Sequence, residues 1–190
     1  LFNFFGVPAL VVNNAPTAID DTDNTDEGNE TSRNASDGVI SNDTDPETNY
    51  TLNITQIEGD NTNVGNATVG DNDGQFIINA NGSYKFDPNG DFDDLAANKN
   101  ETTSINYTVA DGYGGNDTAT LKITVEGVND APSGVDDSIP VTEDTLVTQD
   151  VLGNDTDPEG DALTISSAKI DTNGNGTADS LTLGTTTPIS

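Results

Sequence analysis

Three segments of the chain alternate apolar and polar residues with a period of two. They lie at 50–57, 104–111 and 120–126. This spacing puts every second side chain on one face of a β-strand, so a strand can be half buried with few apolar residues. The longest helical period is confined to a short stretch near 91–98. The pattern predicts an all-β fold of antiparallel sandwich type.

The segment 75–86, QFIINANGSYKF, predicts a β-hairpin in detail. A three-residue loop at 80–82 gathers four large apolar side chains on one face, whereas a two-residue turn would shift the register by one and scatter them. The longer loop requires Gly82 in the left-handed conformation. The predicted cross-strand pairs are Phe76 with Phe86 and Ile78 with Tyr84.

The chain contains a long internal repeat. The letters VNNAP at 12–16 return as VNDAP at 128–132, an offset of 116, and NDTDPE at 42–47 returns at 154–159, an offset of 112. A period near 115 residues is too long for a solenoid unit and fits tandem domains of immunoglobulin size. The second copy ends opposite about residue 76 of the first, so we expect it to be incomplete. The predicted divisions are an apolar strand at 1–13, a first repeat at 14–129 and a partial second repeat at 130–190.

Composition narrows the possible functions. Only 31% of the residues are hydrophobic, Cys and His are absent, and 34 acidic residues oppose five basic ones for a net charge of −29. Without His or Cys the usual acyl-transfer and thiol chemistries are excluded, and we expect no enzyme. The negative charge also disfavours nucleic-acid binding. Because the chain has no Cys, disulfides are excluded, and metal is the expected source of extra stability.

Acidic residues crowd one stretch of the first repeat. Two carboxylates about 5 Å apart repel by roughly 3 kcal/mol at an effective dielectric near 20. A hard cation relieves that repulsion, and calcium takes six to eight oxygen ligands from carboxylates, amides and carbonyls. The crowded residues, all within 20–27, are Asp20, Asp21, Asp23, Asp26 and Glu27.

The segment 171–179, DTNGNGTAD, has the spacing of a calcium-binding loop. Its oxygen-bearing residues stand at positions one, three, five and nine, with a glycine at six, but Thr182 replaces the acid expected at twelve. The alternative is a polar hairpin loop turned by Asn-Gly pairs. The predicted ligands are Asp171, Asn173, Asn175 and Asp179.

Several motifs occur in the order typical of one family. GVNDAP, VLGNDTDPEGDALTI and YTVADGYGGNDTATLKITVEGVNDAP resemble the tandem VCBS-type and cadherin-like repeats of large secreted prokaryotic surface proteins. The resemblance covers residues 12–190 and implies Ig-like β-sandwiches, calcium at and near the domain junctions, and service as an adhesin or stalk. The stretch 22–38 departs from the family because it is more polar than the usual strand there.

The resemblance also implies calcium ligands. Acidic and amide residues around the second repeat motif would bind the ion, and their counterparts would do so upstream. Two alternatives explain these acidic residues without calcium: a solvated acidic surface that keeps the protein soluble, or adaptation to high salt. The implied ligands are Asn129, Asp130, Asp136, Asp137 and Glu143, with Asp20, Asp21 and Glu27 upstream, and Asp45 and Asp157 in the NDTDPE motifs.

Asn-x-Ser/Thr sequons are more frequent than this composition gives by chance. Their number predicts N-glycans on a surface protein, although loop motifs such as NDT also generate sequons. The twelve asparagines are Asn29, Asn34, Asn42, Asn49, Asn53, Asn66, Asn81, Asn100, Asn106, Asn116, Asn154 and Asn175.

Residues 1–12, LFNFFGVPALVV, are uncharged and apolar but too short to span a bilayer. By the repeat alignment they occupy the place of the last strand of a preceding domain. We expect them to complete an upstream domain, to insert into a neighbouring subunit by donor-strand addition, or to be a signal or tag remnant.

Three functions remain open from the sequence. The first is a calcium-stabilised repeat module of an extracellular stalk or adhesin fibre, whose partners are neighbouring repeats, cell-surface proteins or glycans. The second is a pilus-like filament subunit joined through residues 1–12. The third is a glycan-binding module that uses Tyr113, in the loop DGYGGND, as an aromatic platform.

Overall fold

The protein is described by a computed structural model that covers residues 12–47, 49–140, 142–170 and 179–181. The chain divides into two units, residues 1–129 and residues 130–190. Unit 1 holds eight strands and one short 3-10 helix, and unit 2 holds two strands in its described residues. The elements are β1 (Asp21–Asp26), β2 (Thr31–Arg33), β3 (Asn53–Ile57), η1 (Asn61–Asn63), β4 (Thr68–Val69), β5 (Gln75–Ile78), β6 (Tyr84–Asp87), β7 (Asn100–Ala110), β8 (Asn116–Glu126), β9 (Ala168–Ile170) and β10 (Asp179–Leu181).

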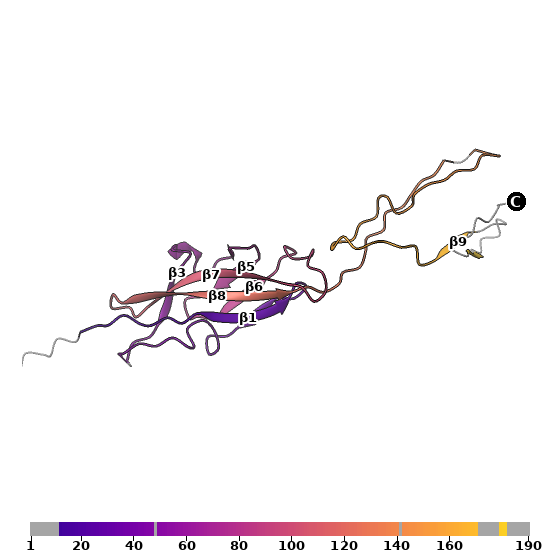
Figure 1. Cartoon of the computed structure of the whole chain (residues 1–190). Helices are drawn as coiled ribbons and strands as arrows, with labels where there is room; N and C mark the ends of the chain where they lie inside the picture. Colours follow the sequence, from indigo (N-terminus) through magenta and orange to yellow (C-terminus); the bar gives the residue numbers. More distant parts are fainter. Residues whose placement is uncertain (1–11, 48, 141, 171–178, 182–190) are drawn as a thin grey trace, which may run out of the picture. The chain divides into compact units, whose positions relative to one another are not determined.

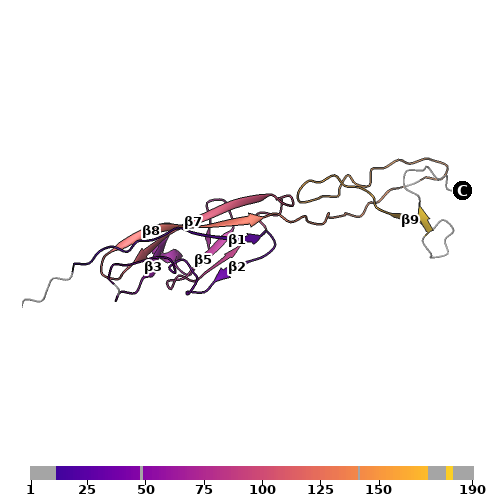
Figure 2. The ribbon, with the colours of Figure 1, turned by 60° about the horizontal axis from the view of Figure 1, so that its bottom comes forward.

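Unit 1 is a sandwich of two four-stranded sheets. One sheet has the order β1-β8-β7-β3 and the other the order β2-β6-β5-β4. The long hairpin of β7 and β8 lies beside β1 in both ribbon views (Figures 1 and 2). This architecture confirms the predicted Ig-like β-sandwich.

One strand pair differs from the predicted antiparallel arrangement. Strand β1 runs parallel to β8, from Asp21 opposite Leu121 to Asp26 opposite Glu126. The chain passes from β1 to the other sheet in β2 and pairs with β1 again only in β8, at the end of the unit. A connection of that length permits parallel pairing.

The core lies between the two sheets and follows the predicted alternation. In β7 and β8 every second side chain is buried, and the residues between them face outward. Hence a chain that is less than one-third hydrophobic still fills a continuous core. The buried apolar residues are Val39, Ile54, Ile57, Phe76, Ile78, Tyr84, Phe86, Phe92, Leu95, Ile105, Tyr107, Val109, Ala119, Leu121, Ile123 and Val125.

The hairpin of β5 and β6 has the predicted register. Phe76 lies opposite Phe86, with ring centroids 4.7 Å apart, and Ile78 lies opposite Tyr84. Gly82 has φ +84°, and a Cβ there would lie 2.8 Å from the Ile40 side chain. The prediction of a three-residue loop with a left-handed glycine is therefore confirmed.

Strand β1 has no apolar residue, and two of its inward positions, Asp21 and Asp23, are acidic. The Tyr107 hydroxyl donates to Asp21 Oδ2 at 2.7 Å, and the Tyr84 hydroxyl donates to Asp23 Oδ2 at 2.7 Å. Arg33 on β2 adds an ion pair to Asp23 at 2.6 Å. Core tyrosines thus satisfy inward carboxylates, so β1 and β2 form within the stretch whose polarity departs from the family pattern.

The described part of unit 2 repeats the contacts of unit 1. Its regular strands are the antiparallel pair β9 and β10, and its first half holds the same loop contacts as unit 1 at the repeat offsets of 116 and 112 residues. In unit 1 Ile19 N donates to Asp43 Oδ1, and in unit 2 Val135 N donates to Asp155 Oδ1, both at 2.8 Å. Asn42 Nδ2 donates to Ile19 O at 3.3 Å, and its counterpart Asn154 Nδ2 donates to Val135 O at 3.5 Å. The bridge Thr17–Thr44 of unit 1 corresponds to the bridge Ser133–Thr156 of unit 2.

Candidate metal centre

Three segments far apart in sequence meet at the N-terminal end of unit 1. They are residues 13–17, the loop 42–47 and the β7–β8 loop 111–115. Thr17 and Thr44 exchange backbone hydrogen bonds of 2.7 and 3.1 Å, which fixes the first segment against the second. The three segments bring carboxylates and amides together.

Asp111 is the most buried carboxylate at this end, with 2% of its surface exposed. Its Oδ1 accepts from the backbone N–H groups of Tyr113 and Gly115, at 2.7 and 3.1 Å, and its Oδ2 accepts from Asn13 Nδ2 at 2.8 Å. Burial alone would raise the pKa of Asp111, but these hydrogen bonds outweigh burial and lower it. A Cβ at Gly115 would lie 2.8 Å from Ala15 Cα, so the loop can close this tightly only with glycine.

Glu47 and Asp45 lie on the second segment. Asn14 donates to Glu47 twice, from Nδ2 to Oε1 at 2.6 Å and from its backbone N–H to Oε2 at 3.3 Å. The backbone N–H of Glu47 donates to Asp45 Oδ1 at 2.7 Å, which closes a turn around Pro46.

Among the described residues, three oxygens at this end have no hydrogen-bond partner. Asn13 Oδ1, Asp43 Oδ2 and Asp45 Oδ2 are shielded from solvent and accept no hydrogen bond. A buried acceptor left in this state costs about 1–3 kcal/mol, and more when it is charged. Oxygens of this type, an amide and a carboxylate, are ligands that calcium prefers.

The electrostatic field at this end is negative. Tyr50 stacks on Tyr113 with ring centroids 4.1 Å apart. Partial burial, the neighbouring Tyr113, and the charges of Glu47, Asp111 and Asp45 raise the pKa of Tyr50. The charges of these three carboxylates act on the same ring, and none of the ion pairs in the described residues involves them.

Comparison with protein families identifies the family of this chain. The family model described as bacterial cadherin-like domain matches residues 13–127. The chain belongs to this family. A second family model, bacterial Ig domain, matches residues 129–189. The resemblance drawn from the sequence motifs is thus confirmed.

Other comparisons add little to this cadherin-like chain. A search of curated proteins found no match. A solved structure of a nucleoside hydrolase-related hypothetical protein from Saccharophagus degradans, associated with carbohydrate metabolism, is 16% identical with a TM-score of 0.35. That match covers 61% of this chain and 26% of the other, so the chain spans about a quarter of that protein.

Cadherin-like and Ig domains of bacteria are typically non-catalytic modules of surface proteins, and cadherin-like domains typically bind calcium. Among the residues that the structure describes, no helix has the length and apolar character needed to cross a membrane.

The cadherin-like fold separates the acids predicted on β1. Asp20 faces outward and accepts from Thr120 N at 2.9 Å, whereas Asp21 faces the core. Glu27 lies beyond the other end of β1 and accepts from Val128 N at 2.6 Å. Six residues of strand at about 3.3 Å each put roughly 20 Å between these ends. One ion cannot bind both Asp21 and Glu27.

The predicted ligands of unit 2 have less defined surroundings. Asp130 N donates to Glu159 Oε1 at 2.7 Å, and Asp157 Oδ1 accepts from Asp161 N at 3.0 Å. The exposed residues are Asn129, Asp136, Asp137 and Glu143. The predicted ligands Asp171, Asn173 and Asn175 lie outside the described residues, and of Asp179 only its place in β10 is described. Residues 1–11 of the proposed donor strand lie outside them as well.

Sequence reasoning named Asp45 but missed Asn13, Glu47 and Asp111. The repeat carried a signal for two of them, since Asn13 is the counterpart of Asn129 and Glu47 ends the NDTDPE motif that supplied Asp45. Asp111 begins the loop DGYGGND, in which sequence reasoning considered only Tyr113 as a binding residue. Tyr113 itself is 67% exposed.

The sequon asparagines share one property. All eleven that the structure describes are exposed, and Asn175 lies outside the described residues. Exposure is required for glycan attachment, and N-glycosylation stays a prediction.

Proposed function

We propose that this chain is a calcium-stabilised repeat module in the stalk or fibre of an extracellular surface protein. The observation that carries the proposal is the pair of partnerless oxygens, Asn13 Oδ1 and Asp45 Oδ2, beside Glu47 and Asp111. An ion bound there would accept electron density from both oxygens and neutralise the surrounding carboxylates.

The choice of metal rests on the donor set. The chain has neither His nor Cys, so zinc and copper lack their usual ligands. Carboxylate and amide oxygens from several loops suit the flexible, high coordination number of calcium better than the rigid octahedron of magnesium.

The ion would stabilise the fold because it joins distant segments. Asn13 and Asp111 are 98 residues apart, and Asn14 and Glu47 are 33 residues apart. An unfolded chain does not hold these groups together, so binding free energy becomes folding free energy. At a calcium concentration about one hundred times Kd, the gain is about 2.7 kcal/mol.

The second unit supports a repeating role. The contact of Asn14 N with Glu47 recurs as the contact of Asp130 N with Glu159, and Asp157 stands in the place of Asp45. Each repeat would therefore begin with the same acidic end, and a series of such repeats would be stabilised along its length by calcium, with neighbouring repeats as its first partners.

The test is a calcium titration of the full chain by calorimetry and thermal melting. We expect Asp45→Asn to lose one bound ion and most of the calcium-induced rise in the Tm of unit 1. Asp37→Asn is the matched control, because it makes the same charge change at an exposed carboxylate that accepts from the adjacent Ser36 hydroxyl. Equal calcium responses of the two variants, or a wild-type Tm insensitive to chelator at moderate salt, would contradict the proposal.

A further inference from the structure

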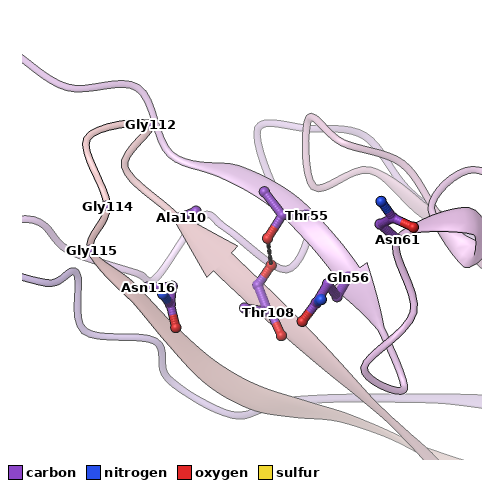
Figure 3. Close-up of a pocket in the computed structure, with 9 residues that line it drawn as sticks. All are labelled: Thr55, Gln56, Asn61, Thr108, Ala110, Gly112, Gly114, Gly115 and Asn116. Carbon is purple, nitrogen blue, oxygen red and sulfur yellow. Dashed lines mark hydrogen bonds between the residues drawn. The ribbon is translucent and has the colours of Figure 1, made fainter.

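A groove of about 370 Å³ opens on the outer face of the β1-β8-β7-β3 sheet of unit 1 (Figure 3). Strands β3, β7 and β8, the helix η1 and the β7–β8 loop all contribute to its lining. Thr108 on β7 faces the groove because the residues on either side of it, Tyr107 and Val109, face the core. The volume lies within the range of small-molecule sites, about 300–1,000 Å³.

Among the described residues, no ionisable side chain lines the groove, although the chain carries 34 acidic residues. An anionic ligand would be repelled by the net charge of −29. A cation would find no carboxylate in the lining. The charge pattern therefore selects a neutral ligand.

The lining offers amide and hydroxyl groups. Figure 3 shows the side chains of Gln56, Asn61 and Asn116 around the groove, and the hydrogen bond drawn there is the one from the Thr55 hydroxyl to the Thr108 carbonyl, 3.4 Å long. Within the described part of the chain, no hydrogen bond occupies the three amides. Each amide presents both a donor and an acceptor to a ligand.

The β7–β8 loop forms one wall of the groove, and its backbone is accessible to a ligand. Gly112 and Gly114 have φ +79° and +108°, and a Cβ at either glycine would meet no atom within 4 Å. Between them, Tyr113 turns its ring onto Tyr50 and is not part of the lining. Recognition in the groove would therefore rest on hydrogen bonds more than on ring stacking.

We propose that this groove binds a neutral oligosaccharide. An amide group can bridge two adjacent sugar hydroxyls, accepting from one and donating to the other, and three amides with a threonine hydroxyl supply several such pairs. The proposal does not depend on calcium binding. The groove shares loop 111–115 with the candidate metal centre, but the three amides and the threonine hydroxyl that would bind the sugar lie outside that centre.

The sugar has two possible sources. Thr55, Thr108 and Asn116 belong to the sequons that begin at Asn53, Asn106 and Asn116. A glycan attached to Asn116 would start at the groove itself. The shared ligand chemistry is that of a neutral sugar chain, carried either by this protein or by another molecule.

The first arm of the test uses the full chain made in a host that does not glycosylate it. Chitobiose, cellobiose and mannobiose are titrated to millimolar concentration while the side-chain amide signals are followed by NMR. We expect at least one disaccharide to shift the signals of Gln56 and Asn61, and the double variant Gln56→Ala/Asn61→Ala to bind it about tenfold more weakly or not at all. The matched control is Gln75→Ala, which removes a half-buried amide from the other sheet.

The second arm separates the two sources. Wild-type chain and Thr118→Ala, which removes the Asn116 sequon but keeps Asn116, are made in a glycosylating host. Binding of free sugar by Thr118→Ala alone assigns the groove to the protein's own glycan, and binding by both assigns it to a foreign one. No shift with any of the three sugars, or equal affinity in the double variant and the control, would overturn the proposal.

Discussion

Removal of the Tyr107 hydroxyl tests how a core tyrosine holds the polar strand β1. The hydroxyl donates to Asp21 Oδ2 at 2.7 Å and lies 3.1 Å from the carbonyl oxygens of Ile19 and Val39. Burial raises the pKa of Asp21, and the hydrogen bond from Tyr107 opposes that rise. Tyr107→Phe removes the donor and leaves the partly buried carboxylate without it.

The expected loss follows from the charge and the burial of Asp21. A hydrogen bond to a charged group contributes about 1.5–3 kcal/mol. Because Asp21 is only partly buried, water can recover part of this, and we expect a loss of about 2 kcal/mol at pH 7. For a domain of this size that corresponds to a Tm lower by roughly 8 °C. The loss should shrink at acidic pH, because a protonated Asp21 no longer needs the donor.

Tyr84→Phe is the matched control for this experiment. Its hydroxyl also donates to an inward acid of β1, Asp23, but Asp23 keeps its ion pair with Arg33. We expect a loss of about 1 kcal/mol for this variant. Urea denaturation in chelator at pH 5 and pH 7 measures both variants. Equal losses for the two, or a Tyr107→Phe loss that does not change with pH, would refute this account of β1.

Two further predictions concern the same end of unit 1. In chelator, Asp43→Asn should stabilise unit 1 by roughly 1 kcal/mol at pH 7, a figure that allows for solvent screening of this partly exposed group. Burial first, then the charges of Asp21 and Asp117, raise the pKa of Asp43 to about 6. The wild type therefore loses stability as the pH rises from about 4 to 6, and the variant does not. A flat difference between wild type and variant across that range, measured by denaturation, would count against it. Gly115→Ala should lower the metal-free Tm and weaken calcium binding about tenfold, because the added Cβ would press on Ala15; unchanged calorimetry would show that the loop has room.

The strands and the β5–β6 hairpin could be predicted because their information is local. In β7 and β8 the period of two survives in the burial pattern, and the pairing of Phe76 with Phe86 follows from loop length alone. Strand β1 could not be predicted in the same way, because its inward side chains are acids. The tyrosines that satisfy them lie 61 and 86 residues away in sequence.

The candidate metal centre was predictable only in part for a related reason. The NDTDPE motif pointed to Asp45, but its neighbours Asn13 and Asp111 come from opposite ends of unit 1 and meet only in the folded state. The crowding of acidic residues in the sequence did not locate this centre, because the crowded residues 20–27 spread along a strand whose side chains alternate between two faces. The repeat was the better guide, because it relates positions that perform the same contact in both units.

The way in which the fold satisfies its acids separates calcium binding from general salt adaptation. Only five basic residues oppose 34 acids, so most carboxylates need another partner. Many accept from backbone N–H groups at strand edges and loop ends, an arrangement that needs no ion. These acceptors include Glu58, Asp71, Asp111 and Asp117, which accept from Asn106, Ser104, Tyr113 and Ala18.

Among the described residues, the shielded oxygens without such a donor include Asn13 Oδ1, Asp43 Oδ2 and Asp45 Oδ2 in unit 1 and Glu159 Oε2 in unit 2. Screening by monovalent salt acts on all exposed charges alike and weakens with burial, so it cannot supply a ligand to shielded oxygens. A divalent ion can do so. The proposed calcium requirement should therefore be local to the N-terminal end of the repeat, and sodium chloride added at equal ionic strength should not replace calcium.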